Sequence, residues 1–168
     1  TQDNVGAGFS SFQFDLSAFE IVGSSLYAVS DKRFIQIDLA TGNRKQLSFG
    51  NDTGALGTGP INAEALADRW TTWDPDREVF WTVGILGGSA AVTVDPTTGN
   101  RTAWPCFHPG LGILSRCGGP GMALVPGPLG FGGMVIDPKP PHDLYFAHDL
   151  SAVVKYEVKT GNSYVMSL

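Results

Sequence analysis

Residues 38–44 read Asp-Leu-Ala-Thr-Gly-Asn-Arg. This stretch occurs again at residues 95–101 as Asp-Pro-Thr-Thr-Gly-Asn-Arg and, more loosely, at residues 157–163 as Glu-Val-Lys-Thr-Gly-Asn-Ser. Each copy has a strand-like run on either side, such as residues 34–37 and 45–47 around the first. An acid followed by Thr-Gly-Asn supplies a side-chain acceptor for the turn amides and a glycine that can adopt positive φ. The stretch therefore predicts a β-hairpin that is repeated three times.

The chain divides into three units when it is aligned on these turns, and each unit contains four short strand-like segments. We expect Gly42, Gly99 and Gly161 to take the positive-φ position of the three turns, because glycine adopts that conformation without steric strain. The expected strands are residues 18–22, 26–29, 33–39 and 44–49, then 70–73, 79–83, 91–94 and 101–104, and finally 134–136, 144–147, 153–158 and 164–168.

A period of roughly 50 to 60 residues that carries four short strands is typical of β-propeller blades. Residues 79–83, Val-Phe-Trp-Thr-Val, are apolar on both faces, as a central strand packed between two blades requires. A β-sandwich would also give alternating strands, but it would not explain why the turn repeats in register. We therefore predict an all-β half-propeller in one domain, residues 1–168, with blade repeats at about 1–49, 50–105 and 106–168.

The composition agrees with an all-β domain. Of the 168 residues 42% are apolar and 16% charged, which excludes a disordered chain, and the 22 glycines and 11 prolines indicate many turns. The net charge of −5, without any cluster of Lys and Arg, argues against nucleic acid or an anionic membrane as a partner. No run of apolar residues is long enough to span a bilayer.

Two cysteines, Cys106 and Cys117, enclose a segment with no regular period. A disulfide that closes this loop would stabilise the fold by about 3 kcal/mol in the loop-entropy model. The alternative is two reduced thiols that are buried separately. A bridge would favour an oxidising compartment, so we expect the protein to be secreted or periplasmic.

The repeat resembles the blades of the SMP-30, gluconolactonase and NHL-like group of six-bladed bacterial propellers. The likeness lies in residues 26–31, Leu-Tyr-Ala-Val-Ser-Asp, followed by residues 34–44, and in the Gly-Pro segments at 57–60 and 118–120. It covers nearly the whole chain as three units. The resemblance implies that the Thr-Gly-Asn turns lie on the face opposite the binding face, and that a small-molecule ligand would sit near the central channel.

The same resemblance places two long connections, residues 50–69 and 105–133, on the binding face, because that face carries the loops between successive blades. The shorter loops that it assigns to this face are residues 31–33, 84–89 and 148–150.

Lactonases of this group bind a divalent cation through Glu, Asn and Asp side chains near the channel, and this implies candidate metal ligands here. They are Asn62, Glu64, His148 and Asp149, which offer the oxygen and nitrogen donors that divalent cations use. The Glu-Gly-Pro opening of the lactonases is missing, and the sequence contains no nucleophile or phosphate-loop motif. We therefore expect no catalytic residue and no cofactor, with a divalent cation as the alternative.

Three functions remain open. The first is a non-enzymatic ligand-binding or interaction module that completes a six-bladed propeller by homodimerisation. We expect such a chain, when alone, to expose apolar blade faces such as the one carrying Phe34, Ile35 and Ile37. The second is a metal-dependent small-molecule hydrolase of the lactonase type, and the third is a fragment of a larger propeller scaffold.

Overall fold

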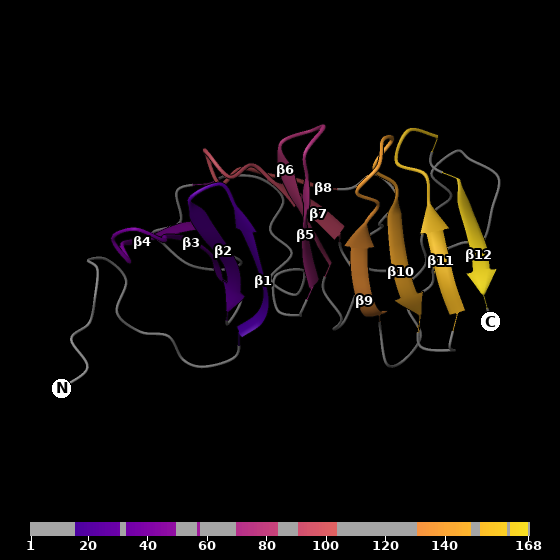
Figure 1. Cartoon of the computed structure of the whole chain (residues 1–168), viewed down its shortest axis with the longest axis horizontal. Helices are drawn as coiled ribbons and strands as arrows, with labels where there is room; N and C mark the ends of the chain where they lie inside the picture. Colours follow the sequence, from indigo (N-terminus) through magenta and orange to yellow (C-terminus); the bar gives the residue numbers. More distant parts are fainter. Residues whose placement is uncertain are drawn as a thin grey trace.

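A computed structural model describes residues 16–30, 33–49, 57, 70–83, 91–103, 131–148, 152–160 and 162–167. These residues form twelve strands in three four-stranded antiparallel sheets, and none of them is helical, so the all-β prediction is confirmed (Figure 1). The first sheet contains β1 (Leu16–Val22), β2 (Ser25–Ser30), β3 (Arg33–Asp38) and β4 (Arg44–Phe49). The second contains β5 (Trp70–Asp74), β6 (Val79–Val83), β7 (Ala91–Val94) and β8 (Arg101–Ala103), and the third contains β9 (Phe131–Ile136), β10 (Leu144–His148), β11 (Ala152–Tyr156) and β12 (Ser163–Ser167).

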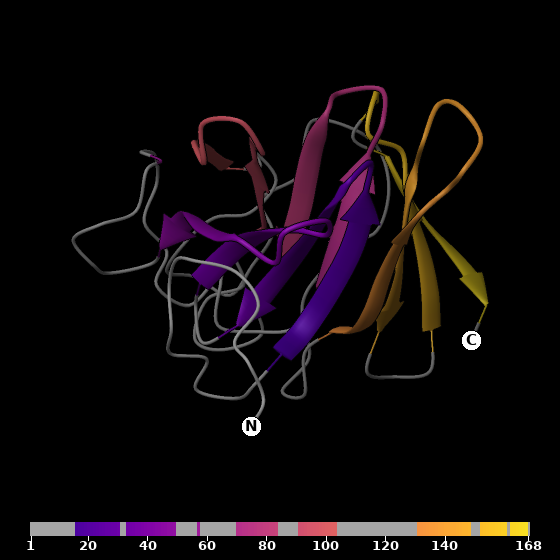
Figure 2. The same cartoon turned by 60° about the vertical axis from the view of Figure 1, so that its left-hand side comes forward.

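In every sheet the strands pair in the order in which they follow one another along the chain. The sheets lie in a row, with β1 beside β5 and β5 beside β9 (Figures 1 and 2). The first strands of successive sheets are thus neighbours, as they are around the axis of a propeller. Among the described residues no helix is long and apolar enough to cross a membrane.

The first repeated turn is held together by its acid. The Oδ1 atom of Asp38 accepts hydrogen bonds from the amides of Ala40 and Thr41, at 3.1 and 2.7 Å, and from the Thr41 hydroxyl at 2.7 Å. The Gly42 amide donates to the backbone carbonyl of Asp38 at 2.8 Å. The Thr41 bonds hold the pKa of the Asp38 carboxyl below its usual range, because they stabilise the charged form.

The other two turns repeat this pattern with small changes. In the second, Asp95 Oδ1 accepts from the amides at Thr97 and Thr98, at 2.7 and 3.2 Å. In the third, the longer side chain of Glu157 reaches the Thr160 hydroxyl at 2.7 Å. Gly42 and Gly99 have φ values of 70° and 73°, in the left-handed region that the repeat led us to expect, whereas Gly161 lies outside the described residues.

The described residues form two core clusters, one on each side of the second sheet. The prediction that the central strand β6 is apolar on both faces is confirmed, because Phe80 enters the first cluster and Trp81 the second. The first cluster contains Tyr27, Val29, Phe34, Leu47, Phe80 and Val94, and the second contains Trp81, Met134, Leu144, Phe146, Val154 and Tyr156.

Candidate functional site

Most of the residues that the sequence singled out for chemistry lie outside the described part of the chain. This holds for Asn62, Glu64 and Asp149, and for both cysteines, Cys106 and Cys117. His148 is the last residue of β10, and only its backbone position is described. Among the described residues no group of three or more His, Cys, Asp or Glu side chains is placed to hold a metal ion. The metal site therefore stays a prediction from the sequence.

What the structure does describe is a row of blade faces, of which the inner ones are covered and the two outermost are not covered by another sheet. The first covered interface joins the first and second sheets. The ring of Tyr27 on β2 lies 4.5 Å from that of Phe80 on β6, centroid to centroid, and Phe34 and Trp73 lie 5.1 and 4.9 Å from the same Phe80 ring. Phe80 and Phe34 have no exposed surface.

Polar groups also join these two sheets. The Trp73 amide donates to Glu20 Oε2 at 2.6 Å, and the Arg101 guanidinium donates to the Ser48 hydroxyl. Burial raises the pKa of the Glu20 carboxyl, and the Trp73 hydrogen bond offsets part of that rise. A charged group thus lies near a largely apolar interface, and it is satisfied by a backbone donor from the neighbouring sheet.

The second covered interface joins the second and third sheets. Trp81 packs with Leu144, Phe146 and Tyr156 of the third sheet and donates its indole N–H to Asp74 Oδ2 at 2.9 Å. Asp74 is fully buried and also pairs with Arg77 at 2.7 Å.

The turns that follow β5 and β9 also touch at this second interface. His142, at 6% exposure, has its Nδ1 atom 2.7 Å from the Asp137 carbonyl oxygen and its Nε2 atom 3.4 Å from Asp76 Oδ1. The turn that starts at Asp74-Pro75 in the second sheet is therefore linked directly to the turn that starts at Asp137-Pro138 in the third.

A pair of adjacent residues in the second strand of each sheet organises both interfaces. The pairs are Leu26-Tyr27, Phe80-Trp81 and Leu144-Tyr145. Because side chains alternate along a strand, the first member faces the preceding sheet and the second faces the following sheet. Tyr27 packs on Phe80, and Trp81 packs in the cluster that contains Leu144. The repeat leaves two members without a neighbouring sheet, Leu26 at one end of the row and Tyr145 at the other.

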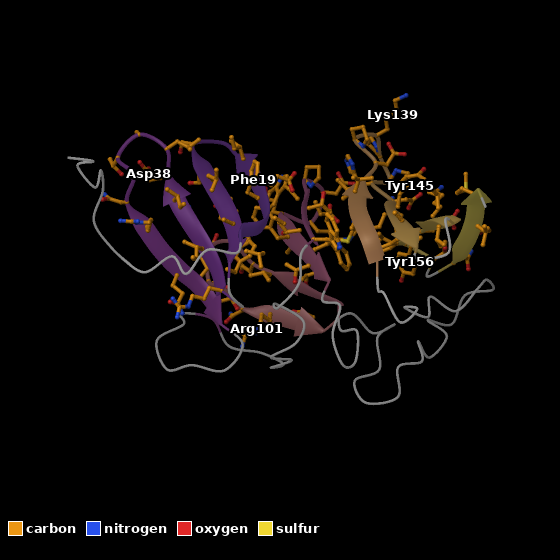
Figure 3. The ribbon with its side chains drawn as sticks, turned by 90° about the horizontal axis from the view of Figure 1, so that it is seen from below. Phe19, Asp38, Arg101, Lys139, Tyr145 and Tyr156 are labelled. Carbon is orange, nitrogen blue, oxygen red and sulfur yellow. The ribbon has the colours of Figure 1, made fainter. Side chains whose placement is uncertain are left out.

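The outer face of the first sheet is apolar. Phe19 and Ile21 of β1 are 67% and 59% exposed, and Leu26 and Ile37 are half-buried. Leu26 pairs across the sheet with Ile21 on one side and with Ile37 on the other, so these three side chains share one face. Figure 3 labels Phe19 on the first sheet and Tyr145 on the third, and the second sheet lies between them.

The expectation of an exposed face carrying Phe34, Ile35 and Ile37 was wrong for two of the three residues. Phe34 points to the other side of the sheet, into the first cluster, because neighbouring residues of a strand face opposite ways. Ile35 shares the outer face with Ile37 but is only 1% exposed, so it is already covered within the chain. The open part of this face lies around Phe19, Ile21 and Ile37.

The outer face of the third sheet mixes apolar and polar groups. Val135 is 61% exposed, Val153 is 38% exposed, and Tyr145 is half-buried. Tyr145 lies between its cross-strand partners Val135 and Lys155, and Lys155 pairs with Asp143 at 2.9 Å. The hydrogen bond to the Asp143 carboxylate raises the pKa of Lys155, because it stabilises the charged form of the amine.

The sequence does contain a signal that the outer faces correspond to the covered ones, although our predictions did not use it. An apolar residue followed by an aromatic one stands at the same place in each second strand, at residues 26–27, 80–81 and 144–145. The two polar bonds between the first and second sheets had no such signal, because their partners are 53 residues apart.

No protein-family model matches the chain. No curated protein sequence matches it either. Solved structures do resemble it. The extracellular domain of a hybrid two-component system protein from B. thetaiotaomicron has a TM-score of 0.51 at 12% identity, and the match covers 91% of this chain and 16% of that one. At this identity the likeness concerns the fold alone.

Two further structures match less closely. A candidate 6-phosphogluconolactonase from Bacteroides fragilis has a TM-score of 0.43 at 18% identity, with 89% of this chain and 36% of that one covered. A hemopexin fold protein from cow pea has a TM-score of 0.44 at 14% identity, with 88% and 63% covered. This chain thus spans less than two thirds of each of the three structures, and none of them selects the SMP-30, gluconolactonase and NHL-like group.

Proposed function

We propose that this chain is a non-enzymatic ligand-binding or interaction module that closes a six-bladed propeller of the SMP-30, gluconolactonase and NHL-like group with a second copy of itself. The observation that carries the proposal is the pair of outer faces. Each has the same place in its sheet as a face that is buried elsewhere in the row. Large apolar side chains such as Phe19, Ile21 and Val135 are exposed there, and exposure of this kind marks an interaction surface.

The number of blades favours two copies. Propellers close with about four to eight blades, and copies of a three-sheet unit reach that range only at six. Two copies give two identical junctions, each joining the first sheet of one copy to the third sheet of the other, and such a ring closes on a two-fold axis. A small-molecule ligand would then bind near the central channel, beside the first strands of the sheets.

The rival occupant of the two faces is a further set of blades on one longer polypeptide. Each structural neighbour is longer than the region it shares with this chain, which is why this rival matters. Light scattering on the folded protein at micromolar concentration separates the two. The proposal predicts a mass about twice the 17.8 kDa of one chain. A well-folded species with the mass of one chain contradicts it.

The proposed location is outside the cytoplasm. One of the neighbours is an extracellular domain, and a bridge between Cys106 and Cys117 would need an oxidising compartment. Fractionation of cells that produce the full-length natural protein tests this: recovery in the cytoplasmic fraction alone would contradict the proposed location.

A further inference from the structure

We infer that the two copies meet first sheet against third sheet, with Tyr145 of one copy seated on Leu26, Ile21 and Ile37 of the other. This inference rests on the proposed function and deepens it, because it names the side chains that meet at each junction of the ring. The alternative is that two copies associate like with like, first sheet on first sheet and third on third, without closing a ring. The two covered interfaces of the chain provide the geometry that decides between these arrangements.

In all three sheets an apolar residue of the second strand and its two cross-strand partners form one apolar surface, which we call the seat. In the second sheet it consists of Phe80 with its cross-strand partners Trp73 and Val94. In the third sheet it consists of Leu144 with Ile136 and Tyr156. Both of these seats are covered by the aromatic residue of the preceding sheet, Tyr27 in one case and Trp81 in the other.

The first sheet carries the same seat without a preceding sheet. Leu26 has Ile21 and Ile37 as cross-strand partners, in the register that Phe80 and Leu144 have with theirs. Ile37 is half-buried, whereas Val94, which has the same place in the second sheet, has no exposed surface; Ile21 is 59% exposed. Because the other two seats each receive an aromatic side chain, the seat of the first sheet, on which the described residues place no such side chain, fits one as well.

Tyr145 is the aromatic residue of this series for which the described part of the chain provides no seat. It follows Leu144 as Tyr27 follows Leu26, and it pairs with Lys155 as Tyr27 pairs with Gln36. The pairing of Lys155 with Asp143, 2.9 Å away, lowers the cost of burying this face below that of an unpaired charge. The apolar seat of the first sheet therefore complements the aromatic face of the third sheet. Two first sheets, or two third sheets, complement each other less well.

A polar contact follows from the same register. Arg101 follows an Asn-terminated turn, faces the preceding sheet and donates to Ser48 on β4. Arg44 has the corresponding place in the first sheet, after Asn43 and opposite Ile37. The inference therefore places Arg44 of one copy over β12 of the other.

Two single variants and their mixture test the inference. Leu26→Asp places a carboxylate in the seat, and Tyr145→Asp replaces the aromatic side chain with one. Each junction would then bury an unpaired charge. Each variant alone retains one usable face but no matching pair, so we expect its dimer dissociation constant to rise at least about 100-fold. Their equimolar mixture regains one matched junction, and we expect it to form mixed dimers more tightly than either variant alone.

Like-with-like pairing predicts the reverse. The Leu26→Asp variant would keep a third-on-third junction, the Tyr145→Asp variant would keep a first-on-first junction, and mixing would give no gain. That result, with the unmodified protein still dimeric, overturns the inference and the closed six-bladed ring but leaves self-association through the outer faces standing. A single-chain mass for the unmodified protein overturns both.

A second measurement covers the case in which either variant fails to fold. p-Benzoylphenylalanine replaces Tyr145 and keeps an aromatic ring in place, and a heavy-isotope copy marks links between chains. We expect photo-crosslinks from position 145 to β2 and β3 of the other copy. Crosslinks to the third sheet of the other copy, or none between chains in a protein of dimer mass, contradict the inference.

Discussion

Tyr27 of the first sheet packs on Phe80 of the second, with the ring centroids 4.5 Å apart and the ring planes inclined by 42°. Phe80 has no exposed surface, so its removal leaves a cavity between the sheets. We expect Phe80→Ala to lower the free energy of unfolding by about 3–5 kcal/mol. Leu39→Ala, at a half-exposed turn residue, is the control and should cost less than about 0.5 kcal/mol. Equal costs in denaturant unfolding would contradict the packing role of Phe80.

Gly99 combines a positive φ of 73° with a close neighbour, because an added Cβ atom would overlap the Leu47 carbonyl oxygen. Gly23 has a φ of 59° but open space where the Cβ would lie. Gly23→Ala should therefore cost about 1 kcal/mol from the backbone alone, and Gly99→Ala should cost more. Thermal unfolding of the two variants checks this. If Gly99→Ala is no more destabilised than Gly23→Ala, the close approach of β4 to the second turn is wrong.

Glu20 should make the protein less stable as the pH rises. Burial raises the pKa of its carboxyl above the unfolded value of 4.5, so between these two values the folded protein binds more protons than the unfolded one. Stability is then lost as pH increases through this window. Glu20→Gln keeps an acceptor for the Trp73 amide and removes the titration. We expect it to flatten the stability profile above pH 4.5, with a gain of at most about 1 kcal/mol at pH 7 because the carboxyl is half-exposed.

Unfolding of the wild type and Glu20→Gln at several pH values gives that profile. If the two proteins lose stability in parallel from pH 4.5 to 7, another group is responsible.

Cys106 and Cys117 are expected to form a disulfide, as their spacing around an aperiodic segment indicates. Thiol titration of the denatured, unreduced protein should then find no free thiol. Two free thiols would show that the cysteines are reduced.

The strands were predictable because their cause is local. Alternation and the repeated acid-x-x-Thr-Gly-Asn turn located all twelve strands within a few residues, and Asp38 accepts the turn hydrogen bonds that the repeat implied. Which face of β3 is covered was not predictable from a list of apolar residues, since Phe34 and Ile35 are both apolar and point to opposite sides. The register with the neighbouring strand decides this.

The contacts between sheets could not be predicted from the sequence either. The bond from the Trp73 amide to Glu20 depends on the placement of whole sheets, and neither residue stands out in its own strand. The candidate ligands Asn62 and Glu64 rest on the family resemblance alone, and they lie in a connection whose residues, apart from Gly57, are outside the described part.

Whether a second copy covers the two outer faces is decided by sedimentation equilibrium of the folded protein over a range of micromolar concentrations. We expect a single species of about twice 17.8 kDa that dissociates only together with unfolding or on dilution below its dissociation constant. A folded species that keeps the mass of one chain at every concentration would contradict it.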